Sequence, residues 1–198
     1  MTPLLNSTGL TRRALIASML VAGVCGYLCG PAAAAVRIEG QVRAGGGPLA
    51  NSTVTLWSAG PSAPKQLAQT RTGSDGRFQI GSEESIGADG ILYLTAKGGE
   101  AAVNKGSGDN PAIALLSVLG NAPPSSVVVN EMTTVASAWT NAQFLDGEAI
   151  KGNALGLKIA AGNVPNFVDL ATGGYGVTIQ DALNSGHRHR SCRECMGG

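Results

Sequence analysis

The chain contains 198 residues, of which 43% are hydrophobic and 14% are charged, so it has enough apolar side chains for a packed core. Its 14 basic and 13 acidic side chains give a formal net charge of +1, and the segment 36–185 is mildly acidic because several arginines lie outside it. No basic stripe results, which excludes nucleic acid as an expected partner.

Residues 1–35 predict a secretory signal peptide. Two adjacent arginines precede an apolar run over residues 14–29, and an alanine-rich stretch supplies a cleavage site after Ala35. The run is shorter than the roughly 20 residues of a membrane-spanning helix, so we expect no stable span after cleavage; a retained anchor is the alternative. Residues 11–16 also resemble a twin-arginine signal. We therefore expect an extracytoplasmic protein, periplasmic or secreted, exported by the Sec or the twin-arginine route.

The body of the chain predicts short strands separated by turns. Alternation of apolar and polar residues describes strands with one buried face, which we expect over residues 36–42, 52–57, 67–72 and 77–80. Asp75-Gly76 is a strong turn signal because glycine accepts positive φ. Residues 91–96 are apolar on both faces, as in a strand that is covered on both sides. This succession indicates an antiparallel β-sandwich.

The second half of the chain predicts helices. Residues 112–119 are apolar and fit either a strand or a helix. Asn130 is a good N-cap for a helix with one apolar stripe, formed by Met132, Val135, Ala136, Trp139 and Ala142. A second helix is expected over residues 153–161, ending at Gly162-Asn163. One further helical turn is expected from Pro165.

Several of these residues carry a family resemblance. Gly40-x-Val42, the segment GPLANSTVTLW at 47–57, and then Thr72, Asp75, Gly76 and Phe78 in the pattern TxxDGxF resemble the carboxypeptidase regulatory-like domain. The resemblance covers residues 36–98. It implies a transthyretin-like, carbohydrate-binding-like β-sandwich.

The later segments resemble a region that follows this sandwich in uncharacterised exported bacterial proteins; they are residues 110–120, 127–145 and 160–176. Some of those proteins continue into an NHL-type β-propeller similar to virginiamycin B lyase. This chain contains no propeller, so the resemblance implies no lyase activity here. The sequence after Asn184 departs from the helix expected in such relatives, and we interpret residues 186–198 as a disordered tail from a truncated or frameshifted end.

Candidate catalytic and metal-binding residues are few. Both histidines, His187 and His189, lie in the tail, so the body has no imidazole base for a Ser-His-Asp arrangement. Cys192 and Cys195 add further zinc-ligand types, but a zinc site normally joins ligand pairs across a longer loop. Asp75 is explained by its turn rather than by calcium. We expect no enzyme activity, no cofactor and no bound metal.

Trp57 is the predicted ligand-binding residue. Alternation places it opposite Val54 and Leu56, away from the sandwich core. An exposed indole offers a platform for a sugar ring. The alternative is that the helical segment covers Trp57, since large aromatic side chains are mostly buried.

The sequence therefore predicts a mainly β fold, a transthyretin-like antiparallel β-sandwich followed by a small helix-rich segment. Its expected parts are a signal peptide at 1–35, the sandwich at 36–104, the helix-rich segment at 105–185 and the tail at 186–198. The expected function is a non-catalytic binding or scaffolding module of the bacterial cell envelope, with a polysaccharide or another envelope protein as partner. One alternative is the accessory N-terminal region of a longer lyase-like propeller enzyme. Another is a structural protein that associates through its sheet edges.

Overall fold

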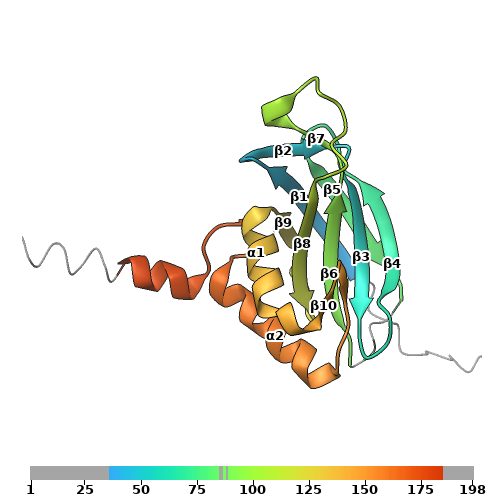
Figure 1. The fold of residues 1–198 in the computed structure, drawn as a ribbon, viewed down its shortest axis with the longest axis vertical. Coiled ribbons are helices and arrows are strands. Elements are labelled where there is room, and N and C mark those ends of the chain that lie inside the picture. The colour runs from blue at the N-terminus through green and yellow to red at the C-terminus, as the bar shows by residue number, and fades with distance from the viewer. Residues whose placement is uncertain (1–35, 85–86, 88, 185–198) are drawn as a thin grey trace, which may run out of the picture. The chain divides into compact units, whose positions relative to one another are not determined.

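The computed structural model describes residues 36–84, 87 and 89–184. Two β-sheets pack face to face, and the main helices lie beside the second sheet (Figure 1). The first sheet has the order β5-β1-β2-β7 with β9 also beside β1, and the second has the order β4-β3-β6-β8. Neighbouring strands are antiparallel except for the parallel pair of β1 and β9. The predicted mainly β fold of antiparallel sheets with a small helical segment is confirmed.

The elements follow one another in a simple chain order. The strands are β1 (Val36–Ala44), β2 (Gly47–Ala50), β3 (Thr53–Ala59), β4 (Lys65–Arg71), β5 (Arg77–Ser82), β6 (Ile91–Lys97), β7 (Glu100–Ala101), β8 (Ala114–Gly120), β9 (Ser126–Val129), β10 (Leu145–Asp146) and β11 (Ala149–Ile150). The helices are η1 (Ala102–Asn104), α1 (Glu131–Thr140), η2 (Ala142–Phe144) and α2 (Ala154–Phe167), and residues 177–184 are also helical.

The strands β3, β6 and β8 of the second sheet contribute buried side chains on both faces, which divides the apolar side chains into two cores. The inner core lies between the sheets and contains Leu56, Phe78 and Leu94. The outer core lies between the second sheet and the helices and contains Tyr93 and Leu157. The six residues 91–96 of β6 are all buried, as predicted for a strand covered on both sides.

Close packing at Gly40 sets the arrangement of the first sheet. Gly40 is paired with Phe78 on β5 and with Val127 on β9. A Cβ at position 40 would lie 2.6 Å from the Phe78 ring and 2.4 Å from the Val127 carbonyl oxygen. The missing side chain therefore lets the phenylalanine ring cover β1 while β9 approaches from the other side.

The predicted Asp75-Gly76 turn leads the chain into β5. Gly76 has a φ of +73°, a conformation that favours glycine. Its carbonyl oxygen accepts the Val42 N–H at 2.8 Å. Asp75 Oδ1 accepts the Arg77 N–H at 3.0 Å, so the aspartate has the turn role expected of it.

Helix α1 closes the free edge of β8 through hydroxyl groups. The Leu116 N–H donates to Thr134 Oγ1 at 3.0 Å, and the Val118 N–H donates to Ser137 Oγ at 2.9 Å. An edge strand otherwise presents unpaired N–H groups. The helix thus provides acceptors for two N–H groups of the β8 edge without adding a strand.

The buried face of α1 differs from the predicted apolar stripe. Thr133, Ala136 and Ser137 are buried, whereas Val135 is 65% and Trp139 is 75% exposed. Of the predicted stripe, Ala136 is buried and Met132 packs against the outer core, whereas Val135, Trp139 and Ala142 are exposed, so the prediction was wrong for these three. The helix meets a strand edge, where hydroxyl groups satisfy backbone N–H groups that leucine or tryptophan could not bond.

Helix α1 begins at its predicted N-cap Asn130 and α2 begins one residue after its predicted start at Asn153, but α2 is longer than predicted. The side chains of Asn130 and Asn153 each accept an N–H from the first turn. Helix α2 continues past Gly162 and contains Pro165. The stop signals are overridden because the turn that follows Gly162 carries Val164, which is fully buried in the outer core.

Both sheets receive a strand from beyond residue 104. Strand β8 completes the second sheet and β9 joins the first, although the expected boundary places both in the helix-rich segment. The apolar run 112–119, which fitted either strand or helix, lies largely in β8. The sandwich and the helical segment therefore overlap along the chain.

Gly40→Ala tests the packing between β1, β5 and β9. We expect the free energy of unfolding to fall by about 1–3 kcal/mol, because the added methyl group forces the Phe78 ring or β9 to shift. Urea denaturation followed by circular dichroism measures the loss. Gly60→Ala is the control, since a Cβ there meets nothing within 4 Å. Equal stability of the two variants would contradict the packing argument.

Ser137→Ala tests the closure of the β8 edge by α1. The variant leaves the buried Val118 N–H without its acceptor, which we expect to cost about 1–3 kcal/mol of stability and to speed amide hydrogen exchange at Val118. Thr140→Ala is the comparison, because the Thr140 hydroxyl donates to the Ala136 carbonyl within the same helix. Unchanged exchange at Val118 in Ser137→Ala would count against the closure.

Candidate functional site

Trp57 lies on the outer face of the second sheet and is half-buried. Its indole stacks on Tyr93 of β6, with ring centroids 6.2 Å apart and planes inclined by 12°. Its Nε1–H donates to Thr95 Oγ1 at 2.9 Å. One ring face and the indole N–H therefore have partners inside the protein. These contacts favour packing over sugar binding, and ligand binding by Trp57 stays a prediction.

Tyr93, the cross-strand neighbour of Trp57, is fully buried. The pKa of the Tyr93 phenol is raised above its ordinary value of 10.0, mainly because the group is buried. A backbone hydrogen bond with Ile150 lowers this pKa, and the nearby Glu148 carboxylate raises it. Glu148 lies in the turn between β10 and β11. The Trp57–Tyr93 pair is therefore a neutral aromatic stack, and the Glu148 carboxylate of the hairpin acts electrostatically on the Tyr93 phenol.

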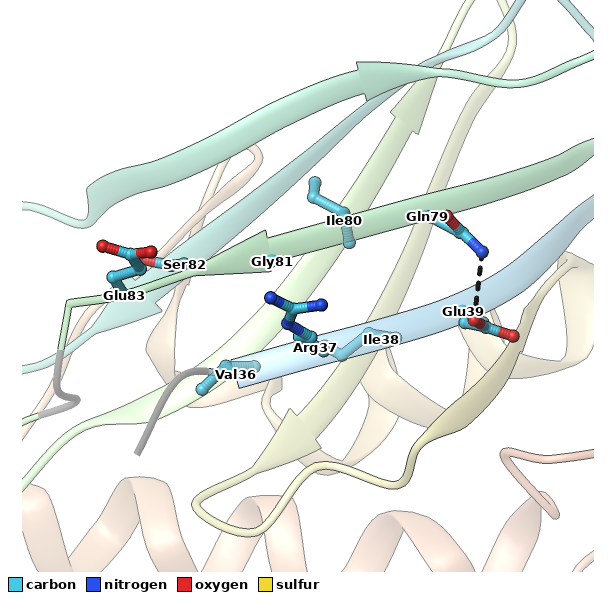
Figure 2. A pocket seen from close by; sticks show the side chains of 9 residues that line it. All are labelled: Val36, Arg37, Ile38, Glu39, Gln79, Ile80, Gly81, Ser82 and Glu83. Atoms are coloured by element: carbon cyan, nitrogen blue, oxygen red, sulfur yellow. Dashed lines mark hydrogen bonds between the residues drawn. The ribbon is translucent and has the colours of Figure 1, made fainter. Parts of the chain in front are cut away.

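The outer face of the first sheet carries an open trough across β1 and β5 (Figure 2). It has a volume of about 350 Å³ and is lined by Val36, Arg37, Ile38, Glu39, Gln79, Ile80, Gly81, Ser82 and Glu83. The Arg37 side chain extends from β1 toward β5, between Glu83 and the linked Glu39 and Gln79 (Figure 2). Gly81, the pairing partner of Arg37, leaves room for this guanidinium group.

The trough combines three planar polar groups from two paired strands. Gln79 Nε2 donates to Glu39 Oε1 at 3.0 Å, which fixes both side chains across the strand pair. Arg37 has no ion-pair partner within the part of the chain that the structure describes. Donors and acceptors are thus presented together on a rigid sheet surface.

A second hollow extends the trough along the same sheet. It has a volume of about 680 Å³, shares Glu39 and Gln79 with the trough, and reaches Arg77 on β5, Ser126 on β9 and Arg71 on β4 of the second sheet. Together the two hollows form a continuous surface across β5, β1 and β9 that also touches β4, and we call it the polar band. Its length and openness suit an extended ligand better than a compact one.

Sequence reasoning identified some of these side chains but not their grouping. Period-two alternation places Arg37 and Glu39 on the outer face of β1, and the structure agrees. Gln79 joins them only because β5 pairs with β1, and Ser126 only because β9 does. Alternation tells which face a residue occupies, but it carries no information about which strand lies alongside.

Other predicted features lie outside the described residues. The signal peptide at 1–35 and the His/Cys tail at 187–195 both belong to this group. Among the residues that are described, no group of three or more His, Cys, Asp or Glu side chains is placed to hold a metal ion. None of the helices in that part combines the length and the hydrophobicity that crossing a membrane requires.

No protein-family model matches this chain, and no curated protein matches it. Among solved structures, it is similar to a 9R-lipoxygenase from Cyanothece PCC8801, with 15% sequence identity and a TM-score of 0.30. The match covers 52% of this chain and 17% of the lipoxygenase. A likeness at this level transfers neither fold nor activity. The resemblance to the carboxypeptidase regulatory-like domain stays a prediction.

The buried Tyr93 phenol predicts a loss of stability at alkaline pH. The unfolded chain releases this proton at a pH of about 10, whereas the folded chain holds it to higher pH because its pKa is raised. The stabilisation of the folded state by the protonated Tyr93 phenol is fully present below a pH of about 10. It is lost as the pH rises through the raised pKa of the folded chain. We expect delayed tyrosinate absorbance that disappears in Tyr93→Phe. If the delayed tyrosinate absorbance persists in Tyr93→Phe, or if it disappears in Tyr175→Phe, it does not come from Tyr93.

Proposed function

We propose that this protein is an extracytoplasmic, non-catalytic binding module of the bacterial cell envelope that holds a polysaccharide on the polar band. One observation carries the proposal: the trough of Arg37, Glu39 and Gln79 lies on a sheet face that is open to solvent. The composition of residues 1–35 supports export.

The chemistry of the trough fits the hydroxyl groups of a sugar chain. Each hydroxyl both donates and accepts hydrogen bonds. The Arg37 guanidinium offers donors, the Glu39 carboxylate offers acceptors, and the Gln79 carboxamide offers both. Bonds that involve the two charged groups are stronger than those between neutral partners.

The geometry of the polar band favours a polymer over a single sugar. Pockets for small ligands enclose most of the ligand surface, whereas this band is open and continues from β5 and β1 to β9. Side chains on neighbouring strands repeat at the spacing of the sheet, so successive sugar units can meet successive polar groups.

The edges of the second sheet do not favour association through added strands. Helix α1 closes the edge of β8 with the hydroxyls of Thr134 and Ser137. The opposite edge strand, β4, carries the exposed charges of Lys65 and Arg71. Charged edge residues oppose strand-to-strand pairing, so binding on a sheet face is the better proposal.

Affinity electrophoresis of the mature protein in gels containing soluble polysaccharides tests the proposal. We expect retention by at least one polysaccharide. The double variant Arg37→Ala/Gln79→Ala should lower the affinity at least about tenfold, because each lost hydrogen bond to the ligand contributes about 1 kcal/mol or more. Its melting temperature should stay unchanged, since both side chains are exposed.

Two comparison variants locate the site. Lys65→Ala removes an exposed charge from β4, outside the lining of the trough, and should leave retention unchanged. Trp57→Phe keeps an aromatic ring on Tyr93 and should also leave it unchanged. If Trp57→Phe abolishes retention while Arg37→Ala/Gln79→Ala does not, the ligand lies on the tryptophan face. No retention of the unmodified protein by any polysaccharide would refute the proposal.

A further inference from the structure

A second pocket lies on the outer face of the second sheet, away from the polar band. It has a volume of about 190 Å³ and lies between β6 and β8, helix α1 and the β10–β11 hairpin. Lys97 from β6 and Glu148 from the hairpin turn both line it and form an ion pair with each other. Their side chains are 52% and 55% exposed, so the pair forms part of the rim.

The interior of this pocket is mostly apolar. Leu116, Ala138 and Leu145 contribute half-buried carbon atoms from β8, α1 and β10. The two hydroxyl groups in the wall already have partners. Thr95 Oγ1 accepts the indole N–H described above, and Thr134 Oγ1 both accepts an N–H from β8 and donates to a carbonyl oxygen at the start of α1.

We propose that this pocket binds a free α-amino acid with an apolar side chain, such as leucine. The side chain occupies the apolar interior, the α-carboxylate pairs with Lys97, and the α-ammonium pairs with Glu148. An amino acid matches the rim because it carries both charges on the carbon that bears the apolar group. The site goes beyond the polysaccharide-binding function and does not depend on it.

The size and the energetics of the pocket agree with this ligand. An apolar cavity of about 150 Å³ holds a benzene molecule, so a pocket of about 190 Å³ has room for an isobutyl or benzyl side chain. The Lys97–Glu148 pair is solvent-exposed on both sides. Exposed pairs contribute little to stability, so a zwitterion can take the place of the direct contact at small cost.

Titration calorimetry and amide NMR of the mature protein with L-leucine test the proposal. We expect saturable 1:1 binding, with shifts at Thr95, Leu116 and Leu145. Isoamylamine and 4-methylpentanoate each keep the isobutyl group, the α-carbon and one charge. Both should bind at least about tenfold more weakly, because one charge-assisted interaction is lost. Glycine, which lacks a side chain, should give no saturable shift.

Matched variants of one hairpin separate recognition from stability. Glu148→Gln removes the partner of the ammonium group and should weaken leucine binding at least about tenfold. Asp146→Asn breaks the 3.3 Å pair with Lys151 in the same hairpin but lies outside the pocket lining, so it should bind leucine normally. Ala138→Leu fills the interior and should abolish binding, with the amide spectrum showing that the fold is retained.

Three outcomes would overturn the proposal. The first is the absence of saturable shifts with leucine. The second is equal affinity for leucine and for isoamylamine or 4-methylpentanoate, because it would show that Lys97 and Glu148 do not recognise both charges of a zwitterion. The third is an equal loss in Glu148→Gln and Asp146→Asn, which would place the effect in hairpin stability. Polysaccharide retention should be the same in all three variants, so the two proposals fail independently.

Discussion

The arrangement of this protein depends on one close contact, the Phe78 ring over Gly40 in the middle of β1. A side chain at position 40 would collide with that ring and with the Val127 carbonyl oxygen. The glycine therefore allows β1 to have β5 on one side and the parallel strand β9 on the other. Both pairings have consequences for the arrangement of side chains. The β1–β5 pair brings Glu39 and Gln79 together, and the β1–β9 pair fixes where the helical segment begins.

Strand β9 ends directly before the N-cap of α1, so the placement of β9 also places the helix beside β8. There the hydroxyls of Thr134 and Ser137 bond the free N–H groups of the strand edge. Because these hydroxyl groups bond the strand, the polar side of α1 faces the sheet, and Val135 and Trp139 are exposed to solvent. The apolar cover of the second sheet then comes largely from α2 and the β10–β11 hairpin.

Local patterns in the sequence predict this structure well, and relations between distant segments are predicted poorly. Alternation placed Val54 and Leu56 in the inner core, and the asparagine N-cap Asn130 located the start of α1. Each of these signals is complete within a few residues. The trough was not predictable as a group, because Gln79 reaches Glu39 through strand pairing across some forty positions. The length of α2 was missed because tertiary burial of Val164 outweighs the local stop signal.

The contacts of Trp57 suggest a different role for this residue from the sugar binding that the sequence predicted. Its indole lies on the outer face as alternation requires, but its N–H bonds Thr95, and Thr95 forms part of the wall of the apolar pocket. The stack on Tyr93 holds the indole in place, and the indole in turn satisfies the hydroxyl oxygen of that wall. Because the Thr95 hydroxyl oxygen already accepts a hydrogen bond, the pocket wall is less polar than a threonine with an unbonded hydroxyl oxygen would make it. Trp57 therefore contributes to the proposed amino-acid pocket by holding the side chain of Thr95 in its wall, and this role requires no contact between Trp57 and a ligand.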